Sequence, residues 1–410
     1  MRRWIVLLLV LVFLVASCVI AVKPAFSNGL VGDSWVSKAS MPSALNFPEA
    51  AEVTGKIYVV GSHHGENVNN SLFEYNPVTN NWTVRQSLPS SRSYFAVAAC
   101  NGKIYVIGGG LNPQTTNAPV ALANNEVYDP ETDSWETMTP MPTARWGIVA
   151  ETVGGKIYVI SGSTGGGYTS VGTNEVYDTE TDTWTTASPI PTSLNGASSA
   201  VIDNKIYVIG GQAEFEGQIN PGLNWIYTPE TDTWTQGAKH PNPERNAAAA
   251  GATTGAMAYK RIYVMGGLAG FAAPIAQNYA YSPIDNSWRA ATSLPTALFN
   301  FAVAVVDDLL YVSGGSTANE VTTSVKCYIP IGYGGTPEPS YALPTPSPSP
   351  TPQSTPTPTP QVTSTPQPQD TSTPEPKRES FPTLPVTAIS ATVAVAVGVG
   401  LLVYFKKRKR

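Results

Sequence analysis

The stretch Glu126-Val-Tyr-Asp-Pro-Glu-Thr-Asp-Ser-Trp135 decides the fold, because its tyrosine and tryptophan recur along the chain. In five places a tyrosine is followed seven residues later by a tryptophan. A sixth tyrosine, Tyr328, has no tryptophan after it, and a sixth tryptophan, Trp35, has no tyrosine before it. These two residues lie at opposite ends of the array, as expected for a sixth unit divided between its ends. The structural repeat residues are Trp35, Tyr75, Trp82, Tyr128, Trp135, Tyr177, Trp184, Tyr227, Trp234, Tyr281, Trp288 and Tyr328.

Each repeat predicts four β-strands. A short apolar run that ends in small residues, such as Lys103-Ile-Tyr-Val-Ile-Gly-Gly109, precedes each repeat tyrosine, and the tyrosines of these runs are 47 to 56 residues apart. Such a period is typical of propeller blades or other repeat arrays. In the second unit the other strands are the small-residue stretch 95–100, then 126–129 and 135–138. Residues 31–333 show no helical periodicity.

The Gly-Gly doublet, the Tyr and Trp seven residues apart, and the following Met-Pro at Met41 and Met141 resemble Kelch repeats, which build β-propellers. The resemblance implies that the small-residue strand of each blade is innermost. We therefore predict an all-β, six-bladed propeller over residues 28–334. Its ring is closed by pairing of the N-terminal strand around Trp35 with the last unit, because closure protects exposed strand edges. An open array of five blades with frayed ends is the alternative.

The N-terminal residues 1–27 predict a secretory signal peptide, because Arg2-Arg3 precedes an apolar run and then small residues. A cleavage site is expected near Ala25. The segment ending at Cys18 also loosely fits a lipoprotein box, which would place a lipid on that thiol.

The C-terminal residues predict a membrane tether. Residues 335–385 contain 16 prolines among Thr, Ser and Gln, a composition that favours a disordered, extended linker and leaves glycosylation open. Residues 386–405 carry no charge and are long enough to span a bilayer as one helix. The basic tail 406–410 then lies in the cytoplasm. We expect a single-pass protein that displays its propeller outside an archaeal or bacterial cell.

Composition excludes some partners. Residues 28–334 contain 14 Lys and Arg against 25 Asp and Glu, a balance opposite to that of a nucleic-acid-binding domain. Cys100 and Cys327 fall on blades that are not adjacent, so we expect two buried thiols and no disulfide. The histidines are His63, His64 and His240. The adjacent pair would point to opposite faces of an extended strand and is a poor set of ligands for a copper-radical site, so we predict no cofactor, no metal and no catalytic residue.

One group of residues predicts a binding site at the axial mouth. The position just before each inner strand is occupied by Leu45, Arg92, Arg145, Leu194, Arg245 and Leu298. Kelch propellers that bind acidic peptides place arginines similarly, so the resemblance implies a carboxylate-binding mouth with adjacent aromatic rings. Alternatively, each arginine donates hydrogen bonds to loop carbonyl groups between blades. The candidate ligand-binding residues are Arg92, Tyr94, Arg145, Trp146 and Arg245.

The resulting functional prediction is a monomeric cell-surface recognition or adhesion module that binds a protein or glycan through propeller loops. An alternative is an enzyme acting on an acidic sugar, because some Kelch propellers rearrange sialic acids. That alternative needs a general acid or base near the mouth, and Glu52 and Glu151 are the carboxyls that the repeat places nearby. A purely structural coat component is a third class.

Overall fold

The computed structural model describes residues 32–61, 70–111, 119–165, 169–213, 222–242, 245–246, 248–269 and 273–335. The chain divides into two compact units, Met1–Tyr341 and Ala342–Arg410, and the described residues all belong to the first. The predicted signal peptide, membrane span and basic tail lie outside the described residues, as does the predicted linker except for Gly335. In the part that is described, no helix is long and apolar enough to cross a membrane.

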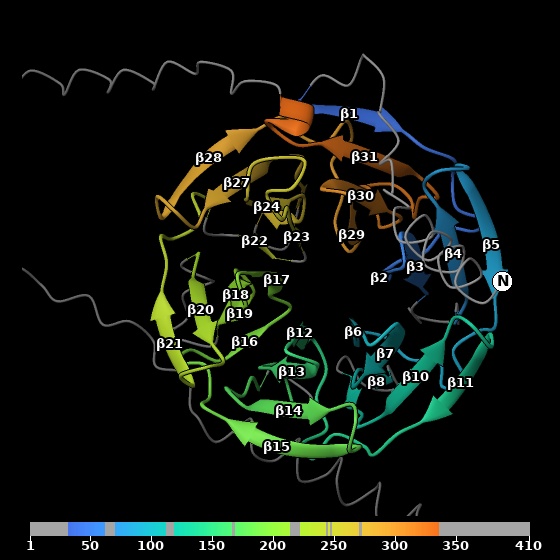
Figure 1. The fold of residues 1–410 in the computed structure, drawn as a ribbon, viewed down its shortest axis with the longest axis vertical. Helices are drawn as coiled ribbons and strands as arrows, with labels where there is room; N and C mark the ends of the chain where they lie inside the picture. The colour runs from blue at the N-terminus through green and yellow to red at the C-terminus, as the bar shows by residue number, and fades with distance from the viewer. Residues whose placement is uncertain are drawn as a thin grey trace, which may run out of the picture. The chain divides into compact units, whose positions relative to one another are not determined.

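Six four-stranded antiparallel sheets are arranged as a ring of blades (Figure 1), which confirms the predicted six-bladed propeller. Blades 1 to 3 consist of β2 (Glu49–Val53), β3 (Lys56–Val60), β4 (Leu72–Asn76), β5 (Asn81–Arg85); β6 (Ala96–Cys100), β7 (Lys103–Ile107), β10 (Asn125–Asp129), β11 (Ser134–Thr137); and β12 (Val149–Val153), β13 (Lys156–Ile160), β14 (Asn174–Asp178), β15 (Thr183–Ala187). Blades 4 to 6 consist of β17 (Ser198–Ile202), β18 (Lys205–Ile209), β20 (Asn224–Thr228), β21 (Thr233–Gln236); β23 (Ala249–Ala252), β24 (Ile262–Met265), β27 (Asn278–Ser282), β28 (Ser287–Ala291); and β29 (Ala302–Val306), β30 (Leu309–Ser313), β31 (Val325–Ile329), β1 (Ser34–Ser37).

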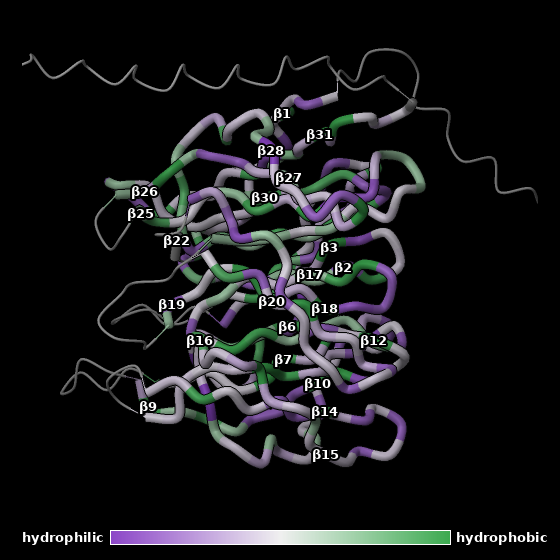
Figure 2. Tube along the Cα trace, turned by 90° about the vertical axis from the view of Figure 1, so that its left-hand side faces the viewer, coloured by the Kyte–Doolittle hydropathy of each residue, from purple (hydrophilic) through white to green (hydrophobic). Residues whose placement is uncertain are grey.

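The two ends of the ring differ. On one end, which we call the loop face, each blade's first strand begins and its second and third strands are connected. Short extra strands lie on this side (Figure 2). Separately, one 3-10 turn among the described residues, Tyr333–Gly335, follows the last strand of the final blade. The extra strands are β8 (Gly110–Leu111) with β9 (Val120–Ala121), β16 (Leu194–Asn195) with β19 (Gln212–Ala213), and β22 (Arg245–Asn246) with β25 (Leu268–Ala269) and β26 (Ala273–Pro274).

The Gly-Gly doublets end the second strands because the backbone of other segments lies against them. A Cβ on Gly108 would lie 2.7 Å from the carbonyl oxygen of Arg145, and one on Gly109 would lie 2.7 Å from that of Ser93. Both glycines also have a positive φ, which residues other than glycine rarely adopt. The end of this strand is therefore too crowded for larger side chains.

The tyrosine and tryptophan of each repeat are cross-strand partners. Tyr128 lies directly opposite Trp135 in the register of β10 and β11, and the same pairing recurs in every blade. The ring centroids of the six pairs are 4.8 to 5.2 Å apart. Aromatic cross-strand pairs of this kind stabilise a sheet, and here they also position the polar groups that join the blades.

A hydrogen-bonded arrangement that we call the seam clamp joins each blade to the preceding one. In blade 2, Asp133 Oδ1 accepts a hydrogen bond from the Tyr128 hydroxyl (2.6 Å) and one from the backbone N–H of Gln86 (3.0 Å). Trp135 Nε1 donates to the carbonyl oxygen of Gln86 (2.8 Å), so both backbone polar groups of one residue are bound. The six clamps are Asn80 and Trp82 on Ala39, Asp133 and Trp135 on Gln86, Asp182 and Trp184 on Thr139, Asp232 and Trp234 on Ser188, Asn286 and Trp288 on Ala238, and Asp33 and Trp35 on Thr292.

The ring is closed by the N-terminal strand, as predicted. β1 pairs with β31, and Trp35 lies opposite Tyr328. Asp33 accepts hydrogen bonds from the Tyr328 hydroxyl (2.6 Å) and from the backbone N–H of Thr292 in blade 5 (2.7 Å). The sixth clamp is therefore assembled from both ends of the array, and the open five-bladed alternative is wrong.

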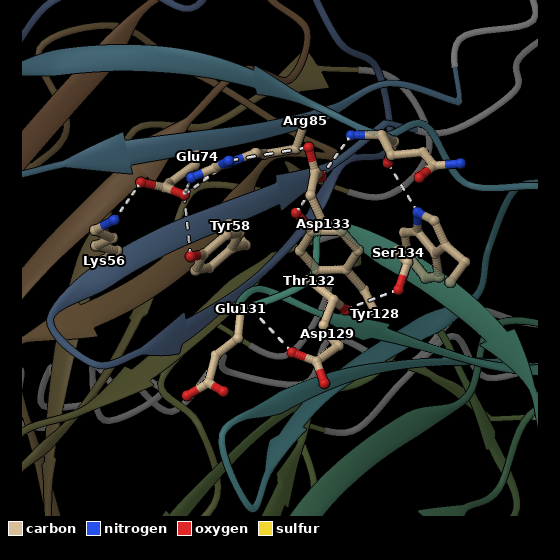
Figure 3. Close-up of polar contacts among 12 residues, drawn as sticks. Lys56, Tyr58, Glu74, Arg85, Tyr128, Asp129, Glu131, Thr132, Asp133 and Ser134 are labelled. Atoms are coloured by element: carbon tan, nitrogen blue, oxygen red, sulfur yellow. Dashed lines mark hydrogen bonds and ion pairs between the residues drawn. The ribbon is translucent and has the colours of Figure 1, made fainter.

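The seam between blades 1 and 2 carries an additional polar network (Figure 3). The buried carboxyl of Glu74 pairs with Lys56 Nζ (2.7 Å) and Arg85 (2.6 Å), and it accepts a hydrogen bond from the Tyr58 hydroxyl (3.1 Å). Burial opposes ionisation of this group, but the three hydrogen bonds outweigh it and hold the pKa of Glu74 below its usual value. Arg85 also reaches toward the clamp residue Asp133 at 3.9 Å, which links the network to the seam.

The clamp at the closing seam gives a stability prediction. We expect Asp33→Ala to lower the free energy of unfolding by about 2–4 kcal/mol, because two hydrogen bonds to a charged acceptor are lost. Asp33→Asn should cost about 1 kcal/mol or less, since Asn80 and Asn286 occupy the same position in two other clamps. Urea unfolding of the full chain would measure both. Equal losses from the two variants would contradict the assigned role of the side-chain oxygen.

Candidate functional site

The six innermost strands surround a cavity of about 480 Å³ on the axis of the ring. Its walls are mostly Ala and Val, such as the Ala96–Cys100 strand of blade 2. These small side chains leave space that larger ones would fill. Three carboxyl groups interrupt the apolar wall, from Glu49, Glu52 and Glu151. The cavity therefore brings carboxyl groups from two blades into an otherwise largely apolar space.

Glu49 and Glu151 line the same axial cavity, with protein on all sides of the ring axis. Glu49 is open to water inside the channel, but protein surrounds the channel, and this loss of bulk hydration raises the pKa of Glu49 to about 8. The charge of Glu151 adds to the shift. Burial likewise raises the pKa of Glu151 to about 7, although a hydrogen bond from Ser199 partly offsets the effect. Both carboxyls therefore change protonation near neutral pH.

Glu52, which the sequence predicted near the mouth together with Glu151, has a local structural role. It belongs to the last half of β2, and its Oε1 accepts a hydrogen bond of 2.6 Å from the backbone N–H of Gly55. That bond stabilises the turn between the first two strands of blade 1. Of the two carboxyls proposed from the sequence, only Glu52 is bound to a turn in this way.

Two aromatic residues with unusual backbone conformations stand at the loop-face end of the inner strands. Phe47, two residues before β2, has a φ of 54°, and Tyr94, two residues before β6, has a φ of 58°. The equivalent residues in blades 3, 4 and 6 are Gly147, Gly196 and Asn300, which suit a positive φ far better. Backbone hydrogen bonds link neighbours of this rim, for example Gly147 N–H to the Tyr94 carbonyl at 2.8 Å.

The rings of three residues form a continuous aromatic cluster at this rim. The ring centroids of Phe47 and Tyr94 are 4.6 Å apart in an edge-on arrangement, and those of Tyr94 and Trp146 are 5.5 Å apart. Phe47 and Tyr94 are half-buried, whereas Trp146 is buried. Of the predicted aromatic ligand contacts, Tyr94 therefore offers surface at the mouth, and Trp146 supports it from beneath.

Arg92 and Arg145 do not present their guanidinium groups to the mouth. Arg92 is 1% exposed, pairs with Glu126, and donates to the backbone carbonyl groups of Gly108 (2.8 Å) and Val106 (3.0 Å). Arg145 is fully buried and pairs with Glu175 at 2.7 Å. It also donates to backbone carbonyl oxygens of blade 3. This geometry corresponds to the structural alternative that the sequence left open.

The repeat itself explains these buried pairs. Blades 2 and 3 combine an arginine before the inner strand with a glutamate on the third strand. Blades 1 and 4 place Leu45 and Leu194 at the arginine position, where they join hydrophobic clusters with Phe73 and Trp225 of the corresponding third strands. A buried ion pair and a buried apolar pair are thus interchangeable solutions for the same place in the blade.

The third predicted arginine, Arg245, belongs to the short strand β22, which pairs with β25 on the loop face. Its side chain lies outside the described residues. Tyr279 of blade 5 occupies the third-strand position that carries Glu126 and Glu175 in blades 2 and 3. A ligand-binding role for Arg245 stays a prediction.

Comparisons with known proteins agree with this architecture. The model of the KLHDC2/KLHL20/DRC7 Kelch-repeats domain matches residues 127–315, and that of the Kelch motif matches residues 45–89 and 91–142. Together the matches cover more than half of the chain. The chain belongs to the Kelch-repeat β-propeller family.

Among solved structures, that of YjhT matches this Kelch propeller with a TM-score of 0.58 and 18% sequence identity. The match covers 70% of this chain and 96% of the other. Identity at this level shows a shared fold. No curated protein matches the chain.

Sequence reasoning missed Phe47 and Glu49. The signal was present, because Glu49 begins an inner strand at the position where the other blades carry Ala96, Val149, Ser198, Ala249 and Ala302. A carboxyl among small and apolar equivalents is conspicuous only after the strands are aligned by register. Phe47 could have been found in the same way, since most equivalents are glycine or asparagine.

The remaining sulfur and imidazole groups are structural where they are described. Cys100 and Cys327 are free and buried, as predicted. His240 is buried and packs edge-on against Trp288, with ring centroids 4.6 Å apart. His63 and His64 lie outside the described residues. Within the described ranges, no group of His, Cys, Asp and Glu side chains is arranged to hold a metal ion.

The buried ion pair of blade 2 gives a prediction by internal exchange. Arg92→Ala should lower the free energy of unfolding by about 3–5 kcal/mol, because Glu126 is left buried without its partner. The double variant Arg92→Leu with Glu126→Phe should recover most of that loss, since it copies the apolar pair of blade 1. Denaturant unfolding of the full chain compares them. A double variant as unstable as the single one would contradict the exchange.

The channel carboxyls predict a pH dependence of stability. Their folded-state pKa values lie above the value of about 4.3 for an unfolded glutamate. Their contribution to the free energy of unfolding is therefore fully present at pH below about 4.3. It is lost as the pH rises through 7 and 8, because the folded state then holds protons that the unfolded state has already released.

A double variant, Glu49→Gln with Glu151→Gln, removes this pH effect. We expect its Tm to match that of the unmodified chain near pH 4 and to exceed it increasingly toward pH 9. Glu52→Gln is the matched control and should show no such rise. A difference in Tm that is constant over this range would contradict the raised pKa values of the two carboxyls.

Proposed function

We propose that this Kelch propeller is a recognition module that binds a protein partner on the loop face, over the mouth of the axial channel. Kelch propellers are commonly protein-binding scaffolds, which supports a partner of this class. The observation that carries the location is the conformation of Phe47 and Tyr94. Both hold a positive φ at positions where other blades use glycine or asparagine.

This conformation is costly for a bulky residue. A left-handed backbone costs about 1–2 kcal/mol for a residue other than glycine. The ring contacts of Tyr94 with Phe47 and with Trp146 return about 0.5–1.5 kcal/mol each, yet the side chains of Phe47 and Tyr94 stay only half-buried. Backbone strain of this kind clusters at binding sites and active sites. The aromatic surface at the rim is therefore best explained by contact with a ligand.

Neighbouring apolar groups extend the surface. Leu111 and Val120 are cross-strand partners in the β8–β9 ladder, and they are 43% and 56% exposed. Ser93, next to Tyr94, forms a bridge with Gly110 of the same ladder. Aromatic and aliphatic groups at the centre of an interface commonly supply most of its binding energy. The loop face of blades 1 and 2 thus supplies the anchor for the partner.

Display at a cell surface remains part of the proposal. It is supported by the sequence features of residues 1–27 and 386–405, which predict export and a single membrane span. In that arrangement the propeller is extracellular, and its loop-face partner is a protein of the environment or of a neighbouring cell.

An enzyme is the second candidate function, because Glu49 and Glu151 have pKa values near neutrality and could serve as general acid and base. The acidic sugar of the original alternative loses its expected support, since Arg92 and Arg145 are buried against glutamates. The channel carboxyls would repel an acidic substrate. Recognition of a protein is therefore preferred.

The binding surface can be tested without damaging the fold. Phe47→Asn and Tyr94→Gly reproduce the residues of other blades and should leave stability unchanged or slightly higher. Binding of the full chain to peptide arrays should weaken by at least about tenfold, because an interface anchor is worth about 2 kcal/mol or more. Val84→Ala is the control, since Val84 is exposed on the outer strand of blade 1. Undiminished peptide binding by both rim variants, or binding to glycan arrays alone, would refute this function.

A further inference from the structure

We propose that the axial channel receives a positively charged lysine or arginine side chain of the protein partner, held by the carboxyl groups of Glu49 and Glu151 behind the rim of Phe47 and Tyr94. This inference rests on the proposed function and names the chemistry that the loop face selects. It reverses the polarity expected from the sequence, where arginines were to hold a carboxylate.

The charges of the site support this polarity. The two arginines that would have made the mouth positive are neutralised inside their own blades by Glu126 and Glu175. Among the described residues, no basic side chain forms an ion pair with Glu49 or Glu151, whereas Glu74 has both Lys56 and Arg85. The propeller region also carries 11 more acidic than basic residues. A cation is thus drawn toward the ring at long range and meets uncompensated carboxyls within it.

The cavity has the shape that a long basic side chain needs. Its volume of about 480 Å³ exceeds what the end of one lysine or arginine fills, and its walls of Ala and Val accept the apolar stem. Glu49 follows Phe47 by two residues, so an aromatic ring and a carboxyl belong to the same junction of loop and strand. Aromatic faces add a favourable cation–π contribution to a cation that passes them.

Besides the three glutamates, the polar side chains that line the cavity are those of Thr152, Ser198 and Ser199. Ser199 donates to Glu151 and fixes its orientation. Glu52 lines the far part of the wall and is engaged by the Gly55 N–H. Arg245 belongs to the loop face of blade 5, and the experiment below treats it as a competing cation. The pair formed by Glu49 and Glu151 is therefore the site that an incoming cation meets.

Protonation should couple to this binding. A cation binds the ionised carboxyls more tightly than the neutral ones, so binding lowers their raised pKa values and releases protons. Affinity is accordingly expected to rise with pH across the interval from about 6 to about 9 and then to level off, because the two pKa values are about 7 and 8.

The test uses the full chain and blocked pentapeptides of the form Gly-Gly-X-Gly-Gly. Ligand-observed NMR compares X as lysine or arginine with X as norleucine or citrulline, which keep the shape without the charge. We expect binding of the charged peptides alone. Glu49→Gln and Glu151→Gln should each weaken it at least about tenfold, and Glu52→Gln should not. The expected signature at higher pH is tighter binding by the unmodified chain and no pH dependence in the double glutamine variant.

Several results would overturn the proposal, and they separate it from the recognition function. Equal binding of norleucine peptides, still lost in Phe47→Asn, would keep the recognition surface and remove the cation. Binding of glucosamine without any peptide would identify an amino sugar in place of a protein. Peptide binding that appears only in Arg245→Ala would mean that the channel holds the chain's own arginine. No binding by lysine or arginine peptides in any variant would also reject the cation site, while array binding reports on the recognition surface independently.

Discussion

The propeller depends on one recurring interaction, in which a side-chain oxygen at a left-handed turn position and a tryptophan N–H bind both backbone polar groups of a single residue in the preceding blade. Asp133 and Trp135 do this to Gln86, and five equivalent sets complete the ring. The hydrogen bonds from Gln86 and Tyr128 hold the pKa of Asp133 below its usual value, so the acceptor stays charged. Because each set fixes one blade against the next, the sets together determine the width of the axial space and the positions of the residues that line it.

The features that the sequence predicted well are those that this interaction requires. A tyrosine, a turn residue and a tryptophan must occur at fixed spacing for the bonds to form, so blade number and ring closure could be counted from the repeat. The burial of Arg92 could not be predicted from the repeat spacing, because its ion-pair partner Glu126 lies 34 residues further along the chain. Glu49 was missed for a related reason. Whether an inner-strand residue faces the axis or a neighbouring blade depends on strand register, which became visible only in the assembled sheet.

The distribution of charge shows how one repeat supports two different interiors. Between sheets, carboxyl groups such as Glu74 and Glu175 are matched by cations and contribute to the fold. Along the axis, Glu49 and Glu151 have no such match among the described residues, and their raised pKa values record the cost of holding charge there. Residues that destabilise the folded state are typically found at sites that bind or act on another molecule.

The closing strand also has a consequence for how the molecule reaches its native state. Asp33 and Tyr328 are 295 residues apart in the chain, yet they share the hydrogen bond that completes the ring. During synthesis Asp33 is made long before Tyr328. The N-terminal strand therefore has no pairing partner until the last blade has been made. Long-range pairing of this kind slows folding and leaves the waiting edge open to other chains. Chaperones that cover a nascent N-terminal strand would therefore favour a correctly closed ring over swapped assemblies.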